Sequence, residues 1–131
     1  YSTASLFLKK NSVVYQLKDK NSKITKYEAK NGVYRKFDKI AILINGYSAS
    51  ASEVLTLALK DNLNASVVGI KSFGKGTVQE TEILSSGAMV KYTSAYWLGP
   101  KGESINEKGI EPDIEEKDTN KQLDRAIESV K

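Results

Sequence analysis

The chain contains neither cysteine nor histidine in its 131 residues. The absence of cysteine excludes disulfides, a thiolate nucleophile and Cys-ligated zinc or iron–sulfur sites. The absence of histidine excludes, within this chain, a Ser-His-Asp triad, a histidine general base and a His-ligated metal. We therefore expect no metal and no cofactor. Any chemistry must use Ser, Thr, Lys, Tyr, Asp, Glu or backbone groups.

Long hydrophobic runs are also missing, since no stretch approaches the roughly 18 to 20 consecutive apolar residues of a membrane-spanning helix. The start of the chain lacks the basic region of a signal peptide and an initiator Met. Because it begins at Tyr1 and continues into the apolar run Ala4, Leu6, Phe7 and Leu8, we expect this chain to be an excised piece of a longer protein. Hydrophobic residues make up 40% and charged residues 27%, which is typical of a folded globular chain. The length predicts a single domain over residues 1–131.

Positive charge is concentrated near the start of the chain, although the net charge is only +4. Residues 1–39 hold ten Lys and Arg residues against three acidic residues, whereas residues 40–131 hold ten against thirteen. The lysines are interleaved with Val13, Tyr15 and Leu17, a pattern typical of a β-hairpin with one solvated face and a turn at 19–22. No arginine cluster or aromatic platform accompanies them, so we expect no nucleic-acid partner.

The rest of the pattern indicates an α/β fold. Residues 39–44 and 65–70 are apolar runs typical of strands buried on both faces, and helical spacing of apolar residues predicts an amphipathic helix over 50–62. This strand–helix–strand order predicts a βαβ unit with a parallel sheet. Two further strands are expected near 80–84 and 88–97, with a terminal helix over 119–130 capped by Asp118 or Thr119.

Three serines lie between the first apolar run and the predicted helix. Ser48, Ser50 and Ser52 occupy a strand-to-helix turn, where an α/β fold exposes side chains at the carboxyl edge of its sheet. A serine at a helix N-terminus lies among unpaired N–H groups that can stabilise an oxyanion. The alternative is structural, because Ser50-x-x-Glu53 matches a capping box, and caps are far commoner than nucleophiles.

Lys75 lies between two glycines, in a loop that follows the second apolar run. Such a lysine is ordinarily a solvated turn residue. In a chain without histidine, however, a neutral lysine is a base that can activate a serine. A free lysine, with a pKa of about 10.4, is neutral in roughly one molecule in a thousand near pH 7.4, so a lysine base must be desolvated. Because both loops follow successive parallel strands, we expect Ser50 and Lys75 at the same edge of the sheet.

Four motifs resemble those of the carboxyl-terminal processing peptidases, also called tail-specific proteases. The nucleophile segment of that family resembles Ile44-Asn-Gly-Tyr-Ser-Ala-Ser-Ala-Ser-Glu53, and its lysine segment resembles Gly69-Ile-Lys-Ser-Phe-Gly-Lys-Gly-Thr-Val-Gln79. Lys91-Tyr-Thr-Ser-Ala-Tyr-Trp-Leu-Gly-Pro-Lys-Gly102 and Gly109-Ile-Glu-Pro-Asp113 are similar to the segments that follow. The four occur in the family's order and spacing.

The resemblance implies a crotonase-like α/β core and a serine endopeptidase that cleaves proteins near their carboxyl termini. By motif position, Ser50 is the nucleophile, Lys75 the general base and Gln79 the group that orients the lysine. The backbone N–H of Ala51 is then one oxyanion donor, and Glu53 is a helix cap. From chemistry alone Ser48 and Ser52 compete with Ser50, and the family pattern favours the middle serine. The alternative function is a non-catalytic module that binds extended peptides by strand addition.

The resemblance also implies what lies outside this chain. Family cores have an upstream segment, ending in paired glycines, that supplies a second oxyanion donor, and usually a PDZ domain; neither is present here. We therefore expect residues 1–131 to be the C-terminal part of a protease core that has little activity alone and self-associates through exposed strand edges. The implied partner is a protein or peptide substrate. The implied location is outside the bacterial cytoplasm, in the cell envelope or secreted, with a membrane-associated parent protein.

Overall fold

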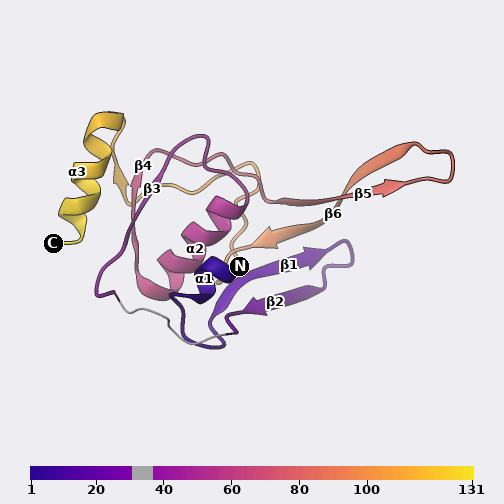
Figure 1. Cartoon of the computed structure of the whole chain (residues 1–131), viewed down its shortest axis with the longest axis horizontal. Helices are drawn as coiled ribbons and strands as arrows, with labels where there is room; N and C mark the ends of the chain where they lie inside the picture. Colours follow the sequence, from indigo (N-terminus) through magenta and orange to yellow (C-terminus); the bar gives the residue numbers. More distant parts are fainter. Residues whose placement is uncertain (31–36) are drawn as a thin grey trace.

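The computed structural model describes residues 1–30 and 37–131, which form two β-sheets and three helices (Figure 1). In chain order the elements are α1 (Ser2–Ser5), β1 (Val13–Asp19), β2 (Ile24–Glu28), β3 (Ala41–Ile44), α2 (Ala51–Leu63), β4 (Ser66–Gly69), β5 (Thr77–Ile83), β6 (Met89–Leu98), β7 (Ile114–Glu115) and α3 (Thr119–Ser129). The α/β class is confirmed, with parallel strands, antiparallel strands and a terminal helix. Within the described ranges, no helix combines the length and apolar character needed to cross a bilayer.

The parallel sheet has the strand order β3-β4-β7. Ala41 is opposite Ser66 and Ile44 is opposite Gly69, with α2 as the crossover between the two strands. This confirms the predicted βαβ unit. Because β3 and β4 are parallel neighbours, the loops that follow Ile44 and Gly69 leave the sheet at the same edge.

Asp113 fixes the start of the third parallel strand. Its Oδ2 accepts a hydrogen bond from the Val67 N–H at 2.9 Å, and its Oδ1 is 2.6 Å from the Lys60 ammonium of α2. The Asp113 N–H in turn donates to the Val67 carbonyl at 2.7 Å. The last residue of the Gly-Ile-Glu-Pro-Asp motif therefore holds β7 to β4 and to α2.

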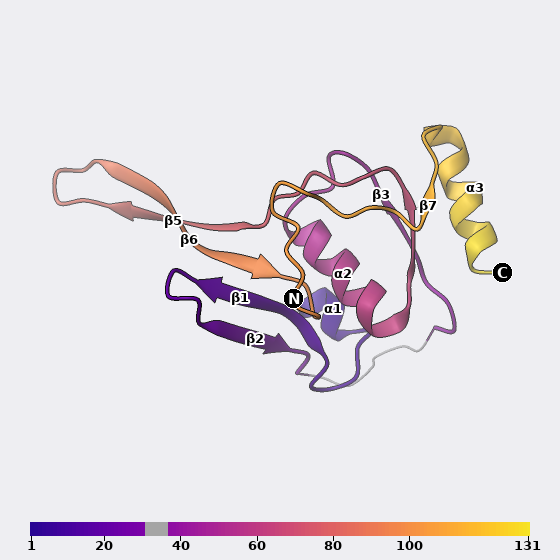
Figure 2. The same cartoon turned by 180° about the vertical axis from the view of Figure 1, so that it is seen from behind.

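The antiparallel sheet has the order β2-β1-β6-β5. The predicted hairpin is present as β1 and β2, and its turn is closed by Asp19, whose Oδ1 accepts hydrogen bonds from the N–H groups of Asn21 and Lys23. Strand β5 pairs with β6 along the whole length of β5, and the two strands project from the body of the molecule as a long arm (Figures 1 and 2). Near its tip, Ile83 and Met89 are 75% and 72% exposed.

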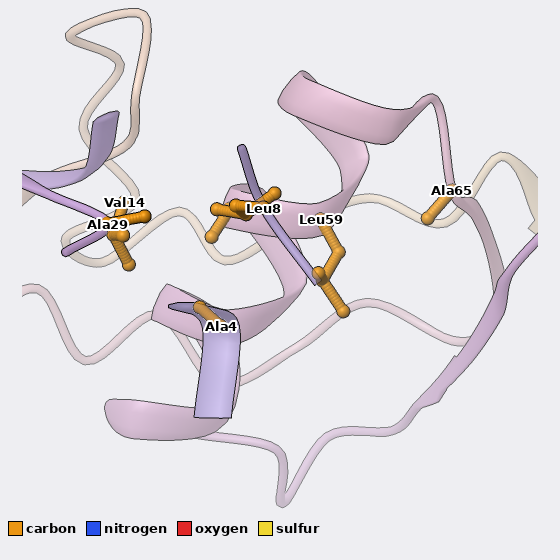
Figure 3. Packing of buried hydrophobic residues seen from close by; sticks show 7 residues of the cluster. Ala4, Leu8, Val14, Ala29, Leu59 and Ala65 are labelled. Carbon is orange, nitrogen blue, oxygen red and sulfur yellow. The ribbon is translucent and has the colours of Figure 1, made fainter. Parts of the chain in front are cut away.

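Helix α2 packs against β1 of the antiparallel sheet and β4 of the parallel sheet, and α3 packs against β3 and β4 (Figure 2). One core cluster joins α1, the β1–β2 hairpin and α2, with Leu8, Val14 and Ala58 fully buried (Figure 3). The other core cluster contains Trp97 of β6 together with apolar residues of β3, α2 and β4. Because α2 contributes to both clusters, it is buried on more than one side.

Two details of the predicted burial are wrong. In β1 the most buried side chains are Val14 and Gln16, because both faces of the hairpin strand are covered, and the Gln16 amide donates to the Pro100 carbonyl at 2.9 Å. In β3, Leu43 is 45% exposed, so this strand is not buried on both faces. The terminal helix is confirmed, and its cap is Asp118, whose Oδ1 accepts from the Asn120 N–H at 3.0 Å.

Candidate active site

The loop after β3 places Ser50 immediately before the first residue of α2. Asn45 and Ser48 shape this loop, since Asn45 Oδ1 accepts from the Tyr47 N–H at 2.9 Å and Ser48 Oγ accepts from the Asn45 N–H at 3.1 Å. Ser50 itself has φ 55° and ψ −112°, a conformation usually taken by glycine in turns. Holding a serine there costs about 1–3 kcal/mol, and such strained residues cluster at functional sites.

The structure separates the three serines of the loop. Ser50 is half-buried and lines a cavity of ≈ 390 Å³. Ser48 supports the turn through its hydroxyl, and Ser52 is an exposed residue of the first turn of α2; neither lines this cavity. The geometry therefore agrees with the assignment of the middle serine as the reactive one.

Lys75 enters the same cavity from the loop after β4, so the expected approach of the two loops is confirmed. Its backbone is held on both sides: the Lys75 N–H donates to Glu53 Oε2 at 3.0 Å, and the Trp97 indole N–H donates to the Lys75 carbonyl at 2.8 Å. The Lys75 side chain is exposed, so the desolvation expected of a lysine base is not provided by the described residues, and its ammonium is not hydrogen bonded to the Ser50 hydroxyl. The two side chains line one cavity without a hydrogen bond between them.

Glu53 joins the serine loop to the lysine loop. The predicted capping box forms, and its Glu53 half is a hydrogen bond of 2.8 Å from the Ser50 N–H to Oε2. Besides the Lys75 N–H, the same carboxylate accepts from the Ser72 hydroxyl at 2.5 Å and from the Gly74 N–H at 2.7 Å, both on Oε1. Glu53 is fully buried, and its four donors come from segments about twenty residues apart. The interpretation of Glu53 as a cap alone is therefore incomplete.

The segment before β7 supports the lysine loop from its other side. The Ile110 N–H donates to Ser72 Oγ at 2.7 Å, and the Ser72 hydroxyl donates to Glu53, so hydrogen bonds through Ser72 connect this segment to Glu53. Gly74 has φ +90°, and a Cβ placed on it would lie 2.7 Å from the Gly109 nitrogen. Both the backbone angle and the close approach require glycine at 74. The family motifs at 69–79 and 109–113 are thus in direct contact.

The cavity walls come from β5 and β6 of the antiparallel sheet, from the loop after β4 and from the residue that precedes α2. Its lining residues are Ser50, Lys75, Thr77, Val78, Gln79, Lys91 and Trp97. Gln79 is exposed, faces the cavity and is not hydrogen bonded to Lys75. Ala51 is the first residue of α2, so its N–H belongs to the turn in which backbone donors lack intrahelical acceptors. Across the described ranges, no group of three or more acidic side chains is placed to hold a metal ion.

Four residues of this arrangement did not emerge as site residues from the sequence. Glu53 and Ser72 bridge the loops, Trp97 anchors the Lys75 carbonyl, and Lys91 of β6 lines the cavity. The capping-box spacing in the sequence pointed to Glu53 as a helix cap, but that spacing does not predict that a second loop binds the same carboxylate. Trp97 and Lys91 reach the site only through pairing of β5 with β6, which local patterns do not fix.

Comparison with known proteins agrees with the resemblance of the motifs. The model of the family "Peptidase family S41" matches residues 1–116. A "Probable CtpA-like serine protease" of Staphylococcus epidermidis is 46% identical over 114 residues, which are 85% of this chain and 23% of that protein. A protein of the same name from Staphylococcus aureus is 43% identical over 113 residues, again 85% and 23%. The chain therefore spans about a quarter of the length of these relatives.

Solved structures show the same fold. The photosystem II D1 C-terminal processing protease superposes with a TM-score of 0.75 at 30% identity, over 88% of this chain and 30% of that one. A lipoprotein from Streptococcus agalactiae superposes with a TM-score of 0.77 at 24% identity, over 98% and 47%. A family match over most of the residues, relatives at 43% and 46% identity and a shared protease-core fold lead to one conclusion: the chain belongs to peptidase family S41.

Proposed function

We propose that the protein containing this chain is a serine endopeptidase that cleaves protein substrates near their carboxyl termini with a Ser50–Lys75 dyad. The observation that carries this proposal is the convergence of a serine in a strained backbone conformation and a lysine on one cavity. Two loops that follow neighbouring parallel strands supply the pair, and a buried carboxylate joins them. This arrangement suits acyl transfer in a chain without histidine.

In the proposed mechanism the neutral Lys75 amine accepts the proton of the Ser50 hydroxyl while Oγ attacks the scissile carbonyl carbon. The Ala51 N–H donates to the oxyanion that forms. Lys75 then gives its proton to the leaving amine, and a water molecule, activated by the same amine, hydrolyses the acyl-enzyme. Gln79, on the wall next to Lys75, orients the lysine by a hydrogen bond made in the substrate complex.

Cleavage near carboxyl termini is the finer part of the proposal. It is supported by the motif resemblance and by the D1 C-terminal processing protease, which shares the fold at 30% identity. We also propose that the protein acts outside the cytoplasm, at the cell envelope. The name of the Streptococcus lipoprotein, which shares the fold, agrees with such a location. Fractionation of cells, followed by detection of the protein with an antibody, tests this placement.

The decisive experiment compares Ser50→Ala with Ser52→Ala in the full-length protein. Ser50→Ala removes the nucleophile, so turnover of an unfolded protein substrate is expected to fall by several powers of ten. Its cap contributes only about 1 kcal/mol, so the melting temperature should change little. Ser52→Ala is the matched control, because Ser52 is exposed and only two residues further along the chain, and this variant should keep its activity. Activity that survives Ser50→Ala but not Ser52→Ala contradicts the assignment.

Lys75→Arg tests the base in the same assay. Arginine keeps the charge and the reach of lysine but does not release its proton in proteins, so the variant is expected to be inactive. The Lys71→Arg variant is the control. Lys71 is on the same loop as Lys75, but it is exposed and forms an ion pair with Glu111. An active Lys75→Arg protein contradicts the dyad.

A second candidate function, peptide binding without cleavage, is favoured by one observation. Strand β5 is an edge strand of its sheet, and its residues Thr77, Val78 and Gln79 line the cavity. An extended peptide that paired with this edge would lie next to Ser50. The two functions differ in outcome: a binding module retains peptide without cutting it, and Ser50→Ala leaves its affinity unchanged.

A further inference from the structure

A second lysine lies on the wall of the catalytic cavity. Lys91 of β6 lines it together with Ser50 and Lys75. In the β5–β6 arm, Lys91 is paired with Thr81, and Thr93 is paired with Gln79. Antiparallel partners share one face of the sheet, so Lys91 and Gln79 are on the same face of the arm. This face leads from the tip of the arm to the dyad.

The acidic residues of the arm are on its opposite face. Glu80 is paired with Tyr92 and hydrogen bonded to its hydroxyl at 3.3 Å, and Glu82 is paired with Val90. Both carboxylates raise the pKa of Tyr92, and Glu82 has the larger effect. This agrees with the position of Glu80 and Glu82 on the same face of the arm as Tyr92. Lys91 makes no ion pair with any residue in the described part of the chain. The alternation of the strands therefore leaves an unneutralised cation on the catalytic face.

The chemistry of this position selects an anionic ligand. A lysine ammonium has three donors and no acceptor, so its partner must be an acceptor, and a carboxylate gives the strongest pair. An unmodified polypeptide has two kinds of carboxylate, the one at its carboxyl terminus and those of Asp and Glu side chains.

We propose, on the basis of the proposed peptidase function, that Lys91 binds a carboxylate of the substrate polypeptide. The substrate then lies along the face of the arm that contains Gln79, Thr81 and Lys91, and Lys91 favours chains with negative charge on one side of the scissile bond. Ile83 and Met89 are paired at the end of the same face and supply an apolar surface further along the arm.

Four fluorescein-labelled peptides test this subsite: a Glu-containing peptide and its Gln counterpart, each with a free or an amidated carboxyl terminus. Binding is measured by fluorescence anisotropy on the full-length Ser50→Ala protein, and cleavage is measured on the unmodified protein. Preference for a carboxylate is expected to be about 3- to 10-fold and to weaken with added salt. Preference for Glu over Gln identifies a side chain as the source, and preference for the free over the amidated end identifies the terminus.

Lys91→Met should reduce that preference to about one, Lys91→Arg should keep it, and Lys91→Glu should reverse it. Lys26→Met is the matched control, because Lys26 is an exposed lysine of the other hairpin and is expected to leave the preference unchanged. Equal binding of all four peptides, or an undiminished preference in Lys91→Met, overturns the subsite. A protein that binds with the expected preference but cleaves none of the peptides counts against the peptidase and supports the subsite.

Discussion

At the scale of single residues, Glu53 determines how the two loops of the site are joined. Each carboxylate oxygen accepts two hydrogen bonds, and the donors belong to Ser50, Ser72, Gly74 and Lys75. Its position in the first turn of α2 also places its negative charge at the positive end of the helix dipole. We propose that Glu53 is a positioning residue, because it bonds the backbones of Ser50 and Lys75 and does not itself line the cavity.

Glu53→Gln should weaken both stability and catalysis. A glutamine amide has one oxygen in place of two and turns an N–H₂ group toward backbone donors, so at least one pair of buried donors loses its acceptor. The cost is expected to be about 2–4 kcal/mol of unfolding free energy. In the full-length protein, kcat should fall more than tenfold at temperatures well below the melting point, with a smaller change in KM.

Glu82→Gln is the control for this prediction, because Glu82 is an exposed residue of the arm and should change neither quantity. Unfolding curves and steady-state kinetics are measured on the same preparations. If Glu53→Gln loses stability but keeps its full kcat, the carboxylate is a structural cap and does not position the dyad.

The sequence predicted the positions of Ser50 and Lys75 better than the contacts that hold their loops. Ser50 and Lys75 are found within short motifs, each after an apolar strand, and the parallel arrangement of those strands predicts that the two loops meet. The partners of Glu53 and the anchor at Trp97 are contacts between segments about twenty residues apart, which depend on the packing of the whole core. The roles of Ser50, Lys75, Gln79 and Ala51 in chemistry stay predictions.

At the scale of secondary structure, the long elements were predicted and the short ones were missed. The crossover helix, the two parallel strands and the terminal helix lie within a few residues of the predicted ranges. Strand β7 has two residues and α1 has four, too few for a periodic pattern to be detected. The faces of β1 were misassigned because neighbouring elements cover both of its sides.

A pair of carboxyl groups connects α2 to the turn after β6. Asp61 of α2 and Glu103 each have one buried carboxylate oxygen without a donor among the described residues. Burial, followed by the hydrogen bond with Asp61, raises the pKa of Glu103 from 4.5 to about 7. The other charged group on this pair is Lys101, whose ammonium is 2.9 Å from Asp61 Oδ1. A proton held by Glu103 satisfies both carboxyl groups.

This pair predicts a fall in stability as the pH rises. Between pH 4.5 and about 7 the unfolded chain loses the Glu103 proton while the folded protein keeps it, so the unfolding free energy decreases through this window and levels off above it. The loss should be on the order of 1 kcal/mol, because the group is partly exposed and screened by water. Thermal melts across this pH range, on wild type and variants, measure the effect.

Glu103→Gln should remove this contribution, since its amide donates to Asp61 at every pH. The variant is expected to be more stable than the wild type at pH 8 and nearly equal to it at pH 4.5. The control is Glu28→Gln, an exposed residue of β2 that should retain the wild-type pH profile. Identical slopes for wild type and Glu103→Gln would show that the two carboxyl groups do not share a proton.

At the scale of the whole molecule, the β5–β6 arm carries a group of exposed apolar side chains. Ile83, Leu84, Met89 and Val90 gather near its end, and the outer edge of β5 has no partner strand within the described ranges. An unpaired edge next to apolar side chains favours pairing between chains. We therefore propose that the 131-residue polypeptide by itself forms dimers or larger assemblies through this arm.

Light scattering on the isolated polypeptide measures this association. The variant with Ile83→Lys and Met89→Lys should shift its mass to that of a monomer, because two charges at the tip repel and solvate the arm. Neither side chain belongs to the core, so dissociation is the only cause expected to lower the melting temperature of this variant. The control is Leu123→Lys on α3, which changes an exposed leucine away from the arm and should leave the assembly intact. A polypeptide that is already a monodisperse monomer contradicts association through the arm, and loss of the assembly only with Leu123→Lys would place the contact on α3.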